Sequence, residues 1–162
     1  MSSSRLGRRL AVVRSLAASP RDSWLLLRMA GWALVIPLLK FLLPLPRLVR
    51  LVTPRPRRRA AEHDRVMRLT SLLYGSGAFR LSDNCLERSL VTFRYLAAAG
   101  VTPTLVVGMR NQDGGYVGHA WVTLDGQLMH DAPELVSTLA PVVAFTADGR
   151  IVRSAEPKAP AA

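Results

Sequence analysis

The chain has 162 residues, one cysteine and a formal net charge of +11. This length is typical of one domain with a core of its own, and a lone cysteine excludes a scaffold held by internal disulfides. The excess charge lies in residues 1–59, which hold 13 Lys and Arg residues and a single acid, Asp22. We expect no cofactor and no metal, because the sequence has no Gly-rich phosphate loop and no Cys/His cluster.

The first 59 residues read as a hydrophobic, basic helical segment that ends in a Pro/Arg linker over residues 53–59. Ser19 and Pro20 form a helix-start signal. The apolar stretch over residues 24–45 has a longest charge-free run of 11 residues, whereas a membrane span needs about 20. Three interpretations stay open: a helix that covers the rest of the chain or a partner protein, a membrane-surface helix with arginine anchors, and a true span.

The only cysteine, Cys85, is predicted to begin a helix. Asn84 is a favourable N-cap, and Glu87 follows three residues later as in a capping box. Apolar residues then repeat at helical spacing until Gly100, a natural helix stop. The free N–H groups and the dipole of a first helical turn favour the thiolate form of a cysteine. Cys85 is therefore a candidate nucleophile.

The second half of the chain is predicted to form strands over residues 104–109, 116–124 and 127–131, and a further hairpin around Asp148-Gly149. His119 lies in the second of these strands, and Asp131 ends the third. Cysteine, histidine and aspartate in this order are the parts of a thiol nucleophile, its base and the group that orients the base. His130 competes for the role of base, and Glu134 is a weaker candidate orienter.

The turn at Asp125-Gly126 decides whether His119 and Asp131 can meet. A two-residue loop would pair Leu124 with Gln127 and turn the Asp131 side chain away from His119. A three-residue loop over residues 124–126 would place His119 directly opposite Asp131, with Gly126 at the position that needs positive φ. We predict the three-residue loop, although Asp-Gly alone favours the shorter one.

Two motifs carry a family resemblance. The helix sequence Cys85-Leu-Glu-Arg-Ser-Leu and the strand sequence Gly118-His-Ala-Trp-Val, followed by an aspartate, resemble those of the transglutaminase-like cysteine peptidases. Within these, the chain most resembles the stand-alone leader peptidase of lasso-peptide biosynthesis over about residues 60–150. The resemblance implies an α+β, papain/transglutaminase-like fold, in which a nucleophile-bearing helix packs on a small antiparallel sheet.

The same resemblance implies a function. Residues 60–153 would be a thiol protease that removes the leader from a ribosomally made lasso-peptide precursor through Cys85, His119 and Asp131, and residues 154–162 a disordered tail. The implied partners are the precursor peptide, a separate leader-recognition protein and a macrolactam synthetase, with peripheral membrane contact open and no nucleic acid. The expected location is the cytoplasm, with membrane association as the alternative. Two other functions stay open, namely an acyl transferase resolved by an amine and a non-catalytic membrane- or peptide-binding adaptor.

Overall fold

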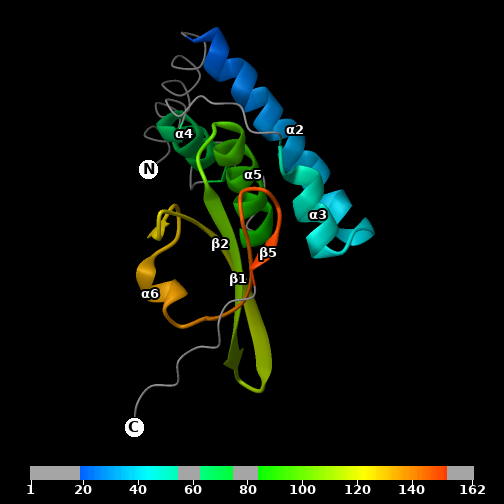
Figure 1. Ribbon diagram of the computed structural model, residues 1–162, viewed down its shortest axis with the longest axis vertical. Coiled ribbons are helices and arrows are strands. Elements are labelled where there is room, and N and C mark those ends of the chain that lie inside the picture. Colours follow the sequence, from blue (N-terminus) through cyan, green and yellow to red (C-terminus); the bar gives the residue numbers. More distant parts are fainter. Residues whose placement is uncertain (1–18, 55–62, 75–83, 153–162) are drawn as a thin grey trace, which may run out of the picture.

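The computed structural model describes residues 19–54, 63–74 and 84–152. The predictions for residues 1–18, most of the Pro/Arg linker and the tail at 154–162 lie outside these residues. The described chain combines helices with one antiparallel sheet, so the predicted α+β class is confirmed (Figure 1). The helices are α2 (Pro20–Leu42), α3 (Leu45–Val52), α4 (His63–Tyr74), α5 (Cys85–Ala98) and the short α6 (Pro133–Val136).

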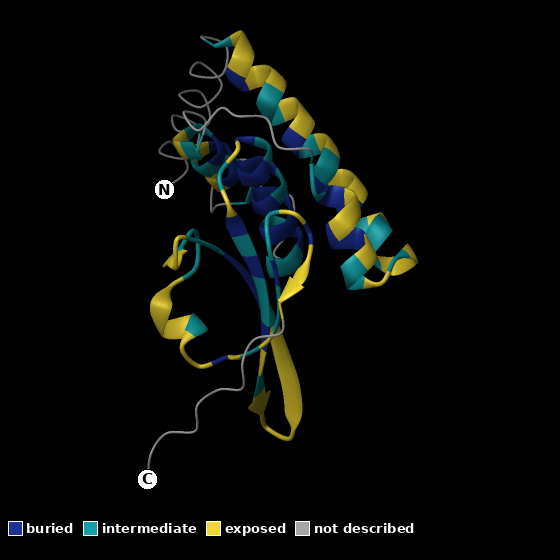
Figure 2. Ribbon diagram, in the orientation of Figure 1, coloured by how far each residue is buried: buried dark blue, intermediate teal, exposed yellow. Residues whose placement is uncertain are grey.

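The sheet has five strands in the order β3-β2-β1-β4-β5, and all neighbours are antiparallel. The strands are β1 (Pro103–Gln112), β2 (Gly115–Leu124), β3 (Gln127–Leu128), β4 (Ala140–Phe145) and β5 (Ile151–Val152). The predicted hairpin around Asp148-Gly149 is confirmed by the β4–β5 pairing. The ends of β1 and β2 extend as an exposed ribbon beyond the helices (Figure 2).

The core lies between α5 and one face of the sheet. Leu105 of β1 pairs with Val122 of β2 and Phe145 of β4, and all three side chains are buried in the same cluster as Leu90 and Leu96 of α5. Since side chains alternate along a strand, His119 and Trp121 turn to the opposite face of the sheet. The candidate histidine therefore lies on the side away from the main core.

Helices α2 and α3 pack on the outside of α5. Met29, Ala33 and Ile36 of α2 join the same buried cluster as the α5 side chains. The helix begins as predicted, because the Ser19 hydroxyl accepts a hydrogen bond from the Asp22 N–H. It also continues through Pro37, which lies inside the helix. Side chains on both sides of the predicted domain boundary at residue 59 thus share one core, and the boundary itself stays a prediction.

Charged pairs fix both ends of α2. Asp22, near the first turn, binds Arg65 at 2.6 Å and Arg68 at 2.8 Å, both from α4. Near the last turn, Lys40 donates to Glu87 of α5 at 2.5 Å. The carboxylates of Asp22 and Glu87 are largely buried, and the loss of one partner from such a pair is strongly destabilising. These contacts hold α2 to the rest of the molecule along its length.

Candidate active site

Cys85 occupies the first position of α5, as predicted. The side chain of Asn84 caps this helix by accepting the Leu86 N–H at 3.0 Å. Cys85 itself is half-buried, with a free thiol. It lies in the first turn of α5, where backbone N–H groups have no partner within the helix.

His119 and Asp131 are in direct contact. The Nε2 atom of His119 lies 2.8 Å from Oδ1 of Asp131, and the Asp131 carboxyl is almost completely buried. A carboxylate accepts, so His119 donates through Nε2 to Asp131. This bond fixes the ring orientation and leaves Nδ1 as the nitrogen available to exchange a proton with a nucleophile or substrate.

The three-residue loop that we predicted is wrong. Leu124 pairs with Gln127 and Thr123 with Leu128, so the loop has two residues. Asp125 and Gly126 have φ values of 50° and 80°, as a type I′ turn requires. The Asp-Gly pair therefore sets the turn by its local preference.

Asp131 nevertheless reaches His119, because β3 is shorter than we predicted. The strand ends at Leu128, and residues 129–131 form a bend. Met129 still donates to the carbonyl of Val122 at 3.1 Å. The next carbonyl on that edge of β2, Ala120, accepts from the Ser89 hydroxyl of α5 at 2.9 Å. The bend frees Asp131 from strand alternation and lets its carboxylate turn to His119.

Arg88 is a site residue that our sequence reasoning missed. Its Nη2 atom lies 2.5 Å from Oδ1 of Asp131, the same oxygen that accepts from His119. Arg88 stands three residues after Cys85, so both belong to the first turn of α5. The guanidinium therefore couples the nucleophile's helix to the orienting carboxylate and adds positive charge there. Its helical spacing from Cys85 was visible in the sequence, but its partner, 43 residues away, was not.

The structure brings two of the three predicted residues, His119 and Asp131, into contact. The first turn of α5 reaches the same edge of β2 through Ser89 and Arg88. Among the described residues, Cys85 makes no hydrogen bond to His119. Catalytic hydrogen bonds are often long without substrate and tighten in the complex.

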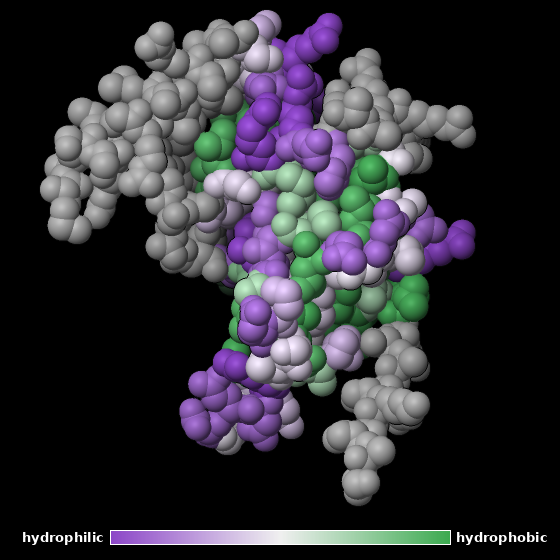
Figure 3. All heavy atoms as spheres, turned by 90° about the vertical axis from the view of Figure 1, so that its left-hand side faces the viewer, coloured by the Kyte–Doolittle hydropathy of each residue, from purple (hydrophilic) through white to green (hydrophobic). Residues whose placement is uncertain are grey.

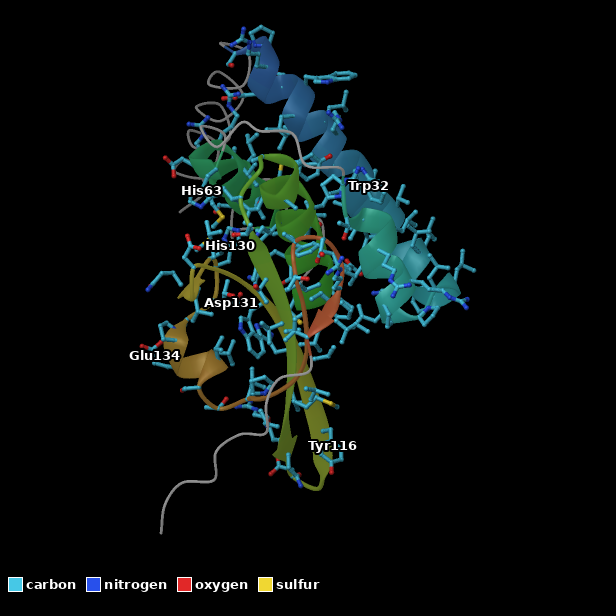
Figure 4. The ribbon with its side chains drawn as sticks, viewed as in Figure 1. Trp32, His63, Tyr116, His130, Asp131 and Glu134 are labelled. Carbon is cyan, nitrogen blue, oxygen red and sulfur yellow. The ribbon has the colours of Figure 1, made fainter. Side chains whose placement is uncertain are left out.

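His130, the alternative base, and Glu134, the alternative orienter, are placed unfavourably for these roles. Burial, together with the nearby Arg88 charge, lowers the pKa of His130 to about 4. An imidazole with this pKa holds a proton poorly near neutral pH, so it is a weak general base. Glu134 is exposed on α6 and points outward, whereas Asp131 lies against the sheet (Figure 4).

Trp121 supports His119 from the same face of β2. Their rings are nearly parallel, at 18°, with centroids 6.3 Å apart. The indole lies over Gly108, the residue that pairs with His119 across the strands. A Cβ at position 108 would lie 2.7 Å from the indole and 2.9 Å from the carbonyl oxygen of Ala140. Glycine is required there by close approach.

The surface on the α6 side is mixed in character. Hydrophobic side chains lie across its middle, with hydrophilic groups above and below (Figure 3). Within residues 19–54, 63–74 and 84–152, no group of three or more His, Cys, Asp or Glu side chains is arranged to hold a metal ion.

Comparison with known proteins gives one match. The model of the transglutaminase-like superfamily matches residues 30–144, which is well over half of the chain. This match begins within α2 and ends within β4, so it includes Cys85 and both partners of the His119–Asp131 bond. No curated protein and no solved structure matches the chain.

Proposed function

The chain belongs to the transglutaminase-like superfamily, and we propose that it is a cysteine peptidase that removes the leader from a ribosomally made lasso-peptide precursor. The observation that carries the catalytic part is the His119–Asp131 bond at the edge of β2, beside the first turn of the helix that begins with Cys85. The lasso-peptide part rests on the resemblance of the Cys85 and His119 motifs.

In the proposed reaction, Cys85 Sγ attacks the carbonyl carbon of the scissile peptide bond, and His119 Nδ1 takes the thiol proton. His119 returns this proton to the leaving amine as the C–N bond breaks, which leaves a thioester on Cys85. Water then attacks the thioester, and His119 transfers a proton from water to the departing thiolate. Asp131 stabilises the imidazolium in both steps.

The residues around the site have supporting roles in this proposal. Arg88 holds Asp131 in place and offsets its charge, so the His119–Asp131 bond keeps its orientation. The free N–H groups at the start of α5 are suited to receive the oxyanion of the tetrahedral intermediate. The partners of this reaction would be the precursor peptide, a leader-recognition protein and a macrolactam synthetase that takes up the freed core.

Cleavage of a synthetic leader–core peptide, followed by mass spectrometry with the recognition protein present, tests the proposal. Cys85→Ala should abolish cleavage, because loss of a nucleophile typically costs several orders of magnitude in rate. His119→Gln should do the same, and His130→Gln serves as the matched histidine control with near-normal cleavage. Retained cleavage by Cys85→Ala would end the thiol mechanism. A product joined to an added amine, in place of a free carboxylate, would assign the chain to acyl transfer.

A further inference from the structure

Helix α2 presents a continuous apolar face to solvent. Large side chains at helical spacing line its outer surface: Trp24, Leu27, Leu34, Val35, Leu38, Phe41 and Leu42. Phe41 is 82% exposed and Leu42 is 76% exposed. The row from Trp24 to Phe41 is about 25 Å long at the rise of an α-helix. Figure 2 shows this exposed stripe along the outer side of α2. Exposed apolar patches of this extent mark a contact surface.

The exposed charges on α2 and α3 themselves are of one sign. In α2 and α3 the exposed charged residues are Arg21, Arg28, Arg47 and Arg50. The single acid of these two helices, Asp22, is buried and bound to α4. A protein partner is usually met by a rim with hydrogen-bonding groups of mixed character. An apolar stripe on helices whose exposed charges are all arginines instead suits an anionic lipid surface.

A hollow on the same face of α2 is suited to bind a lipid headgroup. It measures about 280 Å³ and is lined by Arg28, Gly31, Trp32 and Val35. The space beside Gly31 is open, because a Cβ there would meet nothing within 4 Å. The guanidinium of Arg28 can bind a phosphate, while the neighbouring wall is apolar.

The contacts of the opposite face of α2 argue against a transmembrane arrangement. By length and composition, α2 is the candidate span among the described residues. However, Met29 and Ile36 are buried against the core, and ion pairs bind the helix to α4 and α5 near its two ends. A span across the bilayer would break all of these contacts. The helix is therefore suited to lie in the plane of the membrane surface.

We propose that the outer face of α2 docks the protein on anionic phospholipid membranes, with the helix parallel to the surface. The apolar row enters the boundary between headgroups and acyl chains, and the arginines meet the phosphates. This docking is independent of the catalytic proposal, because the face carries none of the candidate catalytic residues.

Vesicle flotation with the full chain tests this proposal, using phosphatidylcholine vesicles with and without phosphatidylglycerol. The wild-type chain should float with the anionic vesicles and lose affinity as salt rises. Leu34→Glu with Leu38→Glu should lower this affinity by at least about a hundredfold. The control is Val142→Glu, at an exposed apolar residue on β4, and this variant should bind within about twofold of wild type. Arg21→Gln and Arg28→Gln should each cost about fivefold on anionic vesicles.

Depth measurements distinguish docking in the plane from a span. In a Cys85→Ser background, a fluorophore attached at Leu27→Cys, Leu34→Cys or Phe41→Cys should be quenched by nitroxide lipids at similar shallow depths. A label at Leu34→Cys about 10 Å deeper than the other two would indicate a span and overturn the proposal. Two other results would also overturn the proposal. One is a wild-type chain that does not float with anionic vesicles, and the other is a dimer in solution that dissociates in the Leu34→Glu and Leu38→Glu double variant. In solution without vesicles, the double variant should cleave the leader–core peptide as fast as wild type. A loss of membrane binding can therefore be told apart from a failure of the catalytic proposal.

Discussion

Replacing Gly108 with alanine should destabilise the protein and disturb the candidate active site together. The added Cβ would stand 2.7 Å from Trp121 Cη2 and 2.9 Å from the carbonyl oxygen of Ala140. The second contact is with backbone, where β4 carries an irregularity: Val107 pairs with Val143, but Gly108 pairs with Pro141. Neither the buried indole nor the strand can move without loss of packing.

The expected magnitude follows from these contacts. One extra carbon in a well-packed region typically costs about 1–3 kcal/mol, which for a domain of this size corresponds to a fall in Tm of roughly 3–10 °C. Trp121 stacks on His119, so a displaced indole moves the imidazole. We therefore expect slower alkylation of Cys85 at neutral pH, in addition to the loss of stability.

Two measurements check this prediction: thermal unfolding by circular dichroism, and the rate at which iodoacetamide modifies the only cysteine. Gly118→Ala is the matched control. Gly118 precedes His119 directly, yet a Cβ there would meet only the Gly108 carbonyl oxygen, at 3.9 Å. Trp121→Phe removes the outer part of the indole, so Gly108→Ala should cost less in that background than in wild type. A Gly108→Ala protein with unchanged Tm and unchanged alkylation would refute the close-approach argument.

Two further predictions concern the groups around Asp131. Arg88→Ala should lower stability by about 1–3 kcal/mol, because the buried Asp131 carboxylate loses a partner. It should also slow Cys85 alkylation, because Asp131 then holds His119 less firmly, and Arg88→Lys should restore part of the alkylation rate. An alkylation rate unchanged in Arg88→Ala would limit Arg88 to a structural role. Burial lowers the pKa of His130 from 6.5 to about 4. Between these two pH values the unfolded chain therefore binds more protons than the folded chain. The free energy of unfolding should fall by up to about 3 kcal/mol as pH falls from 6.5 to 4. His130→Phe should flatten this part of the pH dependence in denaturant titrations, and an identical slope would contradict the assignment.

Local chemistry decided much of the fold from the sequence alone. Ser19 and Asn84 begin their helices because a side-chain oxygen binds an N–H within three residues. The Asp-Gly pair at 125–126 likewise forms the two-residue turn that this dipeptide favours. The predicted three-residue loop is wrong because the local preference of Asp-Gly sets the turn, and the bend after Leu128 brings Asp131 to His119. The candidate residues Cys85, His119 and Asp131 could be chosen from residue type, order and resemblance, and their joint catalytic role stays a proposal.

Tertiary structure alone decided how those residues are held. The sequence does not show that β3 stops at Leu128, because the competitor for the next carbonyl is Ser89, from a helix 31 residues earlier. The sequence also does not show that Arg88 binds Asp131, or that Trp121 lies over Gly108. Each of these contacts depends on the packing of α5 against the edge and face of the sheet. Residues far apart in the chain come into contact only after folding. The periodicity of the sequence therefore does not predict which of them will bind the same acceptor or pack together.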